Sequence, residues 1–359
     1  MPGTRHEPAA AAPARVATVR GWRDLRALEP ALHTLHRAAR VPVTARLAWW
    51  RAALTADRDT VPLLLTLPGP GGTLTAAVLV ALRDQDGECR ITSVRPHTDD
   101  VWDVAALSPG ARHTVLAGLI RHAARLNRPW RLTLTGLRDG DEATWFAGQL
   151  PDGRAVPAPP VPGIGFGRDE VPLGPGIRSG LDRSGHRIRQ HALTETIRFD
   201  RETGRLADMR DEIEAVHLAR DHDAGRVSDL DDGAGVAFWR SVYDGHNARG
   251  ELEVATLRLD GHLAAYVVAL ADSPVYRVFD GRFAPKWRLY SPGRRLEVAV
   301  VEHARRRSFR ELDWMSSVAP EKLVASTHSD PRWAVTAAGD ARPALPAGGG
   351  SVVSMAAAP

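Results

Sequence analysis

The pattern of apolar and polar positions predicts the same series of helices and strands twice along this chain. Each series opens with helical stripes, in which apolar residues recur every three or four positions, and continues with short apolar or alternating runs typical of strands. The first series predicts helices over 22–39, 45–54 and 115–126 and strands over 61–67, 74–82, 89–94 and 130–134. The second predicts helices over 206–220, 236–248 and 292–304 and strands over 252–259, 263–270, 275–280 and 309–314.

Two short sequence motifs repeat along with this pattern. The segment 72–82, Gly-Thr-Leu-Thr-Ala-Ala-Val-Leu-Val-Ala-Leu, returns at 261–270 as Gly-His-Leu-Ala-Ala-Tyr-Val-Val-Ala-Leu. Each copy is followed by Ser-Pro-Gly, at 108–110 and at 291–293, just before a helical stripe. The period is far longer than the roughly 50 residues of a solenoid unit. We therefore expect two diverged domains of one fold, of which only one needs to keep a working site.

The order of the elements indicates the fold class. Helices, then a hairpin meander, then strand–helix–strand is typical of an α+β protein with a mixed sheet flanked by helices. A strand that feeds a helix and is followed by a neighbouring parallel strand forms a crossover. The loop before that helix presents free backbone N–H groups, which favour an anion.

Composition suggests where the domains begin and end. Residues 1–17 and 329–359 are rich in Ala, Pro and Gly, so we expect disordered tails there. The stretch 151–180 is dense in Pro and Gly and predicts a linker. The domains would then span 18–150 and 181–328, close to the usual domain size of about 100–150 residues.

Overall composition excludes several classes of protein. With 43% hydrophobic and 25% charged residues, the chain is typical of a globular protein. No apolar run approaches the roughly 20 residues of a membrane span, and no signal peptide is evident. A single cysteine excludes a disulfide framework or a cysteine metal cluster, and the histidines lack metal-ligand spacing. We expect a cytoplasmic protein without a metal.

The charge pattern leaves two interpretations open. Net charge is +4, which is too small for a dedicated DNA-binding protein. Arginines gather at 183–189 and at 305–307. They lie either on solvent-exposed helix faces or on a surface that binds the phosphates of an RNA donor or a nucleotide.

Several segments carry a resemblance to a known family. They are Tyr276–Asp280, the Tyr-Ser-Pro-Gly at 290–293, and the Glu-Leu-Asp-Trp at 311–314 with Lys322 downstream. In this order they resemble the GNAT acyltransferase superfamily, in particular the cellulose-biosynthesis CelD-type branch, which is related to the Fem-type peptidyltransferases. The resemblance implies two tandem GNAT-like domains, with the catalytic one in the C-terminal half.

The resemblance and the demands of acyl transfer suggest site residues. Acyl transfer requires deprotonation of the nucleophile and stabilisation of the carbonyl oxygen. The resemblance implies a catalytic or positioning role for Lys322. Asp313 is interpreted as a base, an orienting group or a turn cap. The other candidates are Tyr276 for catalysis, Ser291, Gly293, Arg294 and Arg295 for the donor phosphates, and Tyr290, Asp280 and Trp239 for the acceptor, with core packing as the alternative for the aromatic residues.

Three functions remain open at this point. The first is an acyltransferase that moves an acyl group from an acyl-CoA co-substrate to an amine or hydroxyl of a small-molecule, cell-surface or natural-product precursor, with no permanently bound cofactor. The second uses an aminoacyl-tRNA donor, as Fem-type enzymes do, and is favoured by the single glycine and the proline of the 291–295 loop. The third is a non-catalytic binding module, favoured by Ser317 and Glu321 where the family has Gly and Tyr.

Overall fold

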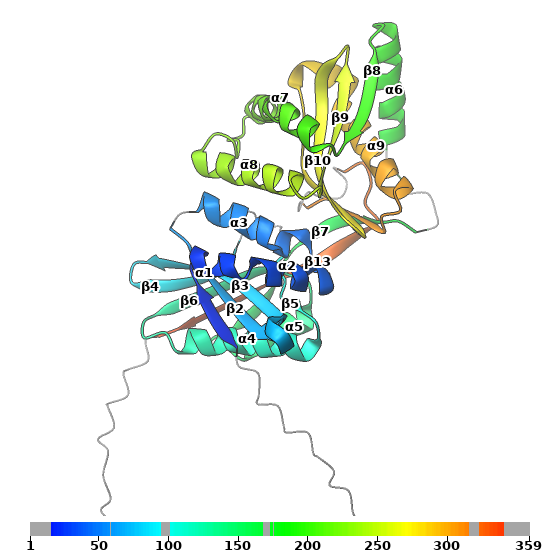
Figure 1. Ribbon diagram of the computed structural model, residues 1–359. Helices are drawn as coiled ribbons and strands as arrows, with labels where there is room; N and C mark the ends of the chain where they lie inside the picture. The colour runs from blue at the N-terminus through cyan, green and yellow to red at the C-terminus, as the bar shows by residue number, and fades with distance from the viewer. Residues whose placement is uncertain are drawn as a thin grey trace, which may run out of the picture.

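The computed structural model describes residues 16–57, 59–94, 101–167, 173–174, 176–315 and 323–340. In this part of the chain, no helix combines the length and the apolar character that crossing a bilayer demands. Two halves of similar build lie one above the other, and one path of paired strands runs through both (Figure 1).

The N-terminal half places its first helices ahead of a meander of strands. Its strands are β1 (Ala17–Arg20), β2 (Val61–Pro68), β3 (Leu74–Gln85), β4 (Glu88–Ser93), β5 (Ala105–Ala106) and β6 (Trp130–Leu137). Its helices are α1 (Trp22–Ala27), α2 (Glu29–Ala38), α3 (Leu47–Ala56), α4 (Pro109–Ala124) and α5 (Gly140–Gly148), with short 3-10 turns at Val43–Ala45 and Pro70–Gly72. The single helix predicted over 22–39 is divided at Leu28, and Pro30 lies in the first turn of α2, where its missing N–H is tolerated.

The C-terminal half repeats this order. Its strands are β8 (Glu195–Asp200), β9 (Leu252–Leu259), β10 (His262–Asp272), β11 (Val275–Phe283) and β12 (Glu311–Asp313). Its helices are α6 (Ile177–Gln190), α7 (Thr203–Asp223), α8 (Gly233–Asn247) and α9 (Pro292–Arg306), with a 3-10 turn at Pro285–Tyr290. Asp260 and Gly261, between β9 and β10, both have positive φ, as the predicted two-residue hairpin turn requires.

The sheet order confirms the duplication. The strands follow the path β1-β2-β3-β4-β6-β13-β7-β12-β11-β10-β9-β8, so five strands of each half appear in matching order from the two outer edges inward. β4 pairs with β6 in parallel, and β11 pairs with β12 in parallel. The helices α4 and α9 connect these two pairs, as predicted for strand–helix–strand crossovers. The predicted mixed sheet flanked by helices is confirmed.

Two strands at the centre of the path correct the predicted boundaries. β7 (Arg154–Gly165) lies in the expected linker and pairs with both β12 and β13. β13 (His328–Gly339) lies, apart from His328, in the expected C-terminal tail and enters the sheet between β6 and β7. Proline fixes φ near −65°, which is compatible with extended backbone, so a proline-rich segment can form a strand when neighbours on both sides supply partners. Residues 1–15 and 341–359, the remainder of the predicted tails, lie outside the described residues.

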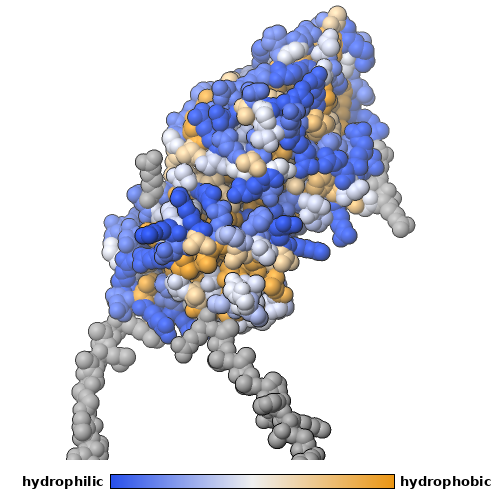
Figure 2. All heavy atoms as spheres, in the orientation of Figure 1, coloured by the Kyte–Doolittle hydropathy of each residue, from blue (hydrophilic) through white to orange (hydrophobic). Residues whose placement is uncertain are grey.

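Three apolar clusters cover the faces of this sheet. One lies beneath α4 and α5 in the N-terminal half, and another beneath α6 and α9 in the C-terminal half. The third joins both halves, because α3 and α8 lie side by side (Figure 1) and the ring of Trp49 meets that of Phe238 edge-on at 5.4 Å. On the face seen in Figure 2, hydrophilic residues cover most of the C-terminal half, and more apolar surface shows over the N-terminal half.

Candidate functional site

The parallel strands β11 and β12 separate at one end and form a fork. They pair only from Val275 to Arg277 and from Glu311 to Asp313, where β12 ends. β11 continues to Phe283, and α9 begins a few residues later. Asp280 lies on the free end of β11, Asp313 ends β12, and Gly293, Arg294 and Arg295 lie in the first turn of α9.

Asp280, on the free end of β11, is the acceptor of a buried hydrogen-bond cluster. Tyr266 donates to its Oδ2 at 2.7 Å, Trp239 Nε1 donates at 3.2 Å, and His217 Nδ1 lies 3.0 Å away. Arg282 donates to Oδ1 at 2.9 Å. Burial by itself raises the pKa of Asp280, but the charge of Arg282 and the hydrogen bond from His217 outweigh it and hold that pKa well below its usual value. Asp280 is therefore ionised at neutral pH and holds its neighbours in place.

A second carboxylate extends this cluster toward α7. Asp221 Oδ2 lies 3.0 Å from His217 Nε2, so the imidazole lies between two aspartates. Arg226 and Arg282 donate to Asp221, at 2.7 and 3.1 Å. Of the two predicted acceptor residues in this region, Asp280 and Trp239, the structure brings both into one network.

Asp313 lies at the branch point of the fork and is buried. Its Oδ1 accepts the backbone N–H of Met315 at 2.8 Å, and its Oδ2 lies 3.5 Å from Arg277 Nε. Arg277 also donates to Asp272 at 2.9 Å, and Asp272 accepts from Arg46 of the N-terminal half. Burial lowers the pKa of Arg277, and the two aspartates oppose that shift. Asp313 thus belongs to a chain of ion pairs that links the halves.

Tyr276 lies on the other face of the sheet. Its side chain is fully buried in the cluster beneath α9, and its hydroxyl donates to Glu253 at 2.8 Å. Burial raises its pKa well above the usual value, and the nearby carboxylate adds to that rise. The structure does not bring Tyr276 to the Asp280 cluster, so we give it no role in transfer.

The Ser-Pro-Gly turn before α9 offers fewer free donors than the sequence predicts. Ser291 adopts a φ of 49° and makes no side-chain cap, and Pro292 has no N–H. The ring of Phe283 lies 3.2 Å from the position that a Cβ on Gly293 would take, so this ring covers the glycine. Anion binding at this helix start would depend mainly on the side chains that follow.

Arg295 already has an ion-pair partner in the structure. Its guanidinium forms a two-pronged ion pair with Glu195 of β8, at 2.6 and 2.5 Å. Arg112 holds the matching place after the first Ser-Pro-Gly and forms a two-pronged pair with Glu142. Because both copies use this arginine structurally, it is a poor candidate for binding the donor phosphates.

Arg294 remains the more accessible cation at the start of α9. Within the described residues it forms an ion pair only with Glu297, at 3.3 Å, and about a third of its side chain is exposed. Burial raises the pKa of Glu297 to about 7, although Arg294 opposes the rise. No pattern in the sequence revealed this shifted carboxyl group beside Arg294.

Two other predicted residues lie apart from this cluster or cannot be placed. The hydroxyl of Tyr290 lies 2.7 Å from Nδ1 of His191, the residue that follows α6, and its ring lies beside Trp287. Lys322 lies outside the described residues, as do Ser317 and Glu321. The roles predicted for Lys322 and Tyr290 stay predictions.

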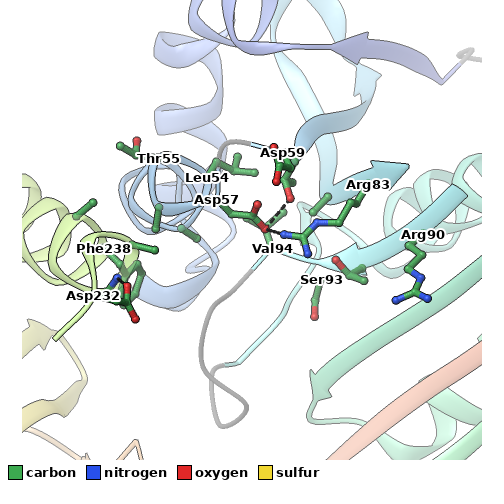
Figure 3. Close-up of a pocket in the computed structure, with 18 of the residues that line it drawn as sticks. Leu54, Thr55, Asp57, Asp59, Arg83, Arg90, Ser93, Val94, Asp232 and Phe238 are labelled. Atoms are coloured by element: carbon green, nitrogen blue, oxygen red, sulfur yellow. Dashed lines mark hydrogen bonds and ion pairs between the residues drawn. The ribbon is translucent and has the colours of Figure 1, made fainter. Parts of the chain in front are cut away.

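A large cleft opens between the halves, and the sequence did not predict its lining. Its volume is about 1190 Å³, and residues of the N-terminal strands, of α3 and of the start of α8 surround it (Figure 3). Its polar lining includes Asp57, Asp59, Arg83, Arg90, Thr92, Ser93, Thr133, Thr135, Asp229 and Asp232. Trp239 lines the same cleft and donates to Asp280, so it connects the cleft with the Asp280 cluster.

One group of side chains has the spacing of metal ligands. Ligand atoms of Glu311, His328 and Asp330 lie within 4.8 Å of one another. Arg332 and Arg138 approach Asp330 to 3.4 and 3.5 Å, however, and their positive charge opposes a cation there. We interpret the group as part of an ion-pair network.

Comparison with known proteins places this geometry in a fold family. Residues 178–323, which are less than half of the chain, match the family model of the acetyltransferase (GNAT) domain. No curated protein matches the sequence. FemX superposes with a TM-score of 0.58 at 10% identity, over 84% of this chain and 95% of FemX.

Two further solved structures are similar. A conserved protein of unknown function from Bacteroides thetaiotaomicron VPI-5482 has a TM-score of 0.56 at 11% identity, over 86% of this chain and 97% of that one. A tandem GNAT protein from the clavulanic acid biosynthesis pathway has a TM-score of 0.43 at 15% identity, over 92% and 100%. At these identities the first two likenesses concern the fold alone. Residues 178–323 thus match a GNAT-type acetyltransferase domain, and the N-terminal half repeats the strand order of the C-terminal half.

Proposed function

We propose that this protein is an acyltransferase whose C-terminal half performs the chemistry. The observation that carries the proposal is the GNAT domain match over residues 178–323, which includes the β11–β12 fork and the start of α9. The order of the motifs from Tyr276 to Lys322 supports the CelD-type branch. The donor would be a thioester of the acyl-CoA type, and the acceptor an amine or hydroxyl of a small-molecule, cell-surface or natural-product precursor.

In the reaction, the acceptor nitrogen or oxygen attacks the carbonyl carbon of the thioester. The carbon–sulfur bond then breaks, the thiol leaves with a proton, and the acceptor loses one. Donors aimed at the carbonyl oxygen stabilise the charge that develops on it. We assign this role to Lys322, and we assign Asp313 to orienting the acceptor. Arg294 would bind the donor phosphates.

Arg294→Ala is expected to weaken coenzyme A binding about tenfold, since a hydrogen bond to a charged group contributes roughly 1.5–3 kcal/mol. Isothermal titration calorimetry with coenzyme A measures the affinity. The matched control is Arg306→Ala at the other end of α9, where the side chain is 67% exposed and lies 3.8 Å from Glu302. Absence of any coenzyme A binding by the unaltered protein would contradict the thioester donor.

An aminoacyl-tRNA donor is the second candidate, and the Ser-Pro-Gly turn favours it. Phe283 covers Gly293, and Arg295 is paired with Glu195, so this turn has few free groups for a pyrophosphate. Exposed arginines on α6 and at the end of α9 would instead contact phosphates along an RNA. In that case tRNA binding should fall steeply with salt, and Arg306→Ala should weaken it. Filter binding with tRNA at several salt concentrations separates the two donors.

A further inference from the structure

The carboxylate of Asp313 faces arginines from both halves of the protein. Its backbone is fixed on both sides, because the residue pairs with Arg277 of β11 and with Gly163 of β7. The direction of the carboxylate is therefore set by side-chain contacts. Oδ1 accepts the backbone N–H of Met315 at 2.8 Å, and Oδ2 faces two guanidinium groups.

Arg138 reaches this carboxylate directly from the N-terminal half. It follows β6, and its Nη2 lies 3.8 Å from Asp313 Oδ2 and 3.5 Å from Asp330 Oδ2. Its Nε and Nη2 are buried and make no hydrogen bond within the described part of the chain. Because the effective dielectric of a buried site is low, a guanidinium and a carboxylate at these distances still attract each other. Charge therefore holds Arg138 beside Asp313.

A second route from the N-terminal half passes through Asp272. Arg46, just before α3, donates to Asp272 Oδ1 at 2.5 Å, and Arg277 donates to Oδ2 at 2.9 Å. The backbone N–H of Val43 also donates to Oδ2, at 3.1 Å. Asp272 thus fixes the buried guanidinium of Arg277, whose Nε lies 3.5 Å from Asp313 Oδ2. At 3.5 and 3.8 Å, neither arginine occupies a lone pair of Oδ2 with a normal hydrogen bond.

We propose that Arg138 and Arg46 are positioning residues through which the N-terminal half orients Asp313 for the acceptor. The inference rests on the proposed function, because that function assigns Asp313 to the acceptor. Arg138 acts on the carboxylate itself, and Arg46 acts through Asp272 and Arg277. Both positioning residues lie outside the segment that matches the GNAT family model. The N-terminal half is then part of the working site, which is incomplete without it.

Amide-resolved hydrogen exchange on the full chain tests the positioning without any substrate. The Met315 N–H is bonded to Asp313, so its protection from exchange reports how firmly the carboxylate is held. In Arg46→Gln/Arg138→Gln this protection should fall about tenfold, because a charge-assisted hydrogen bond loses its fixed acceptor. Amides at the centre of β3 should keep their protection, which separates the local effect from a general loss of stability.

Arg128→Gln is the matched control. This arginine pairs with Asp84, and 35% of its side chain is exposed, against 37% for Arg138. Its replacement should leave the Met315 amide protected. Arg138→Lys keeps the positive charge and should restore most of the protection that Arg138→Gln loses. If the double variant does not fold, Arg138→Gln alone supplies the test, because its side chain is partly exposed and makes no hydrogen bond among the residues described.

Turnover is the second readout. Arg138→Gln should lower kcat about tenfold with the KM for the donor unchanged, since a misplaced orienting group slows the transfer step rather than donor binding. Adding Asp313→Asn should cause no further fall, because Arg138 acts through Asp313. Unchanged Met315 protection in the double arginine variant, or an equal loss in Arg128→Gln, would overturn the inference. Absent turnover in the unaltered protein would contradict the proposed function alone, because the exchange experiment needs no donor.

Discussion

Asp280→Ala is expected to lower the free energy of unfolding by about 3–5 kcal/mol, the usual cost of removing one partner from a buried ion pair. The carboxylate accepts from Tyr266 and Trp239 and pairs with Arg282, and its own side chain is only 6% exposed. Its removal leaves these donors buried without an acceptor. Urea unfolding followed by tryptophan fluorescence measures the change, and a loss below about 1 kcal/mol would contradict the cluster that we describe.

Asp280 also makes the free energy of unfolding depend on pH. Because the pKa of Asp280 is lowered in the folded state, its contribution is present above the unfolded value of about 3.9 and is lost as the pH falls below it. Asp280→Asn should therefore flatten the fall in stability of the unaltered protein below about pH 4. Asp211→Ala, at an exposed position, should change stability by less than about 0.5 kcal/mol at any pH.

Val335→Asp is expected to destabilise the protein by about 4 kcal/mol or more, because it buries an unpaired carboxylate. Val335 is fully buried in the centre of β13, where it pairs with Leu134 of β6 and Ala155 of β7. The prediction tests whether β13, the last strand in the sequence, completes the core of the N-terminal half. Thermal unfolding, together with the yield of folded protein, gives the readout.

Thr336→Asp is the matched control for this strand. Thr336 is the next residue of β13, and it is partly exposed rather than buried. Its replacement should cost less than about 1.5 kcal/mol, since the carboxylate can reach water. If Val335→Asp and Thr336→Asp were equally stable, β13 would not pack as described.

The repeated elements were predictable because their apolar periodicity is strong. Val61–Pro68, Leu74–Gln85 and Leu252–Leu259 are strands in which most residues are apolar, and the structure places each close to its predicted range. The stripe Leu296, Val300 and Ala304 predicted α9, and all three side chains are buried. Periodicity reports which face an element buries, so it locates elements that pack within their own half.

β7 and β13 were missed because their composition opposes the strand that they form. Four prolines between 157 and 162 indicate a turn or linker from local preference alone. Their pairing is decided by tertiary context, since each joins strands from distant parts of the chain. α6 (Ile177–Gln190) was missed for a related reason: Gly180 and Gly185 interrupt a helix with few apolar residues.

The candidate site was only partly predictable. Asp280 and Trp239 were named as acceptor residues, and the structure joins them by a hydrogen bond, which no spacing in the sequence reveals. The threonines of the cleft did leave a signal, because Thr133 and Thr135 alternate with leucines along β6. That alternation marks a polar strand face, although the sequence alone does not say whether such a face meets solvent or a ligand.

The measurement that tests the central claim most directly is transfer of a labelled acyl group to a panel of small amines and matched alcohols, read by mass spectrometry. Acetyl-CoA and an aminoacyl-tRNA serve as donors. The account predicts at least one acylated amine or alcohol with at least one donor, and a rate about 100-fold lower in Lys322→Ala, the usual size of a proton-transfer or oxyanion contribution. No product with either donor, or an unchanged rate in Lys322→Ala, would contradict the account.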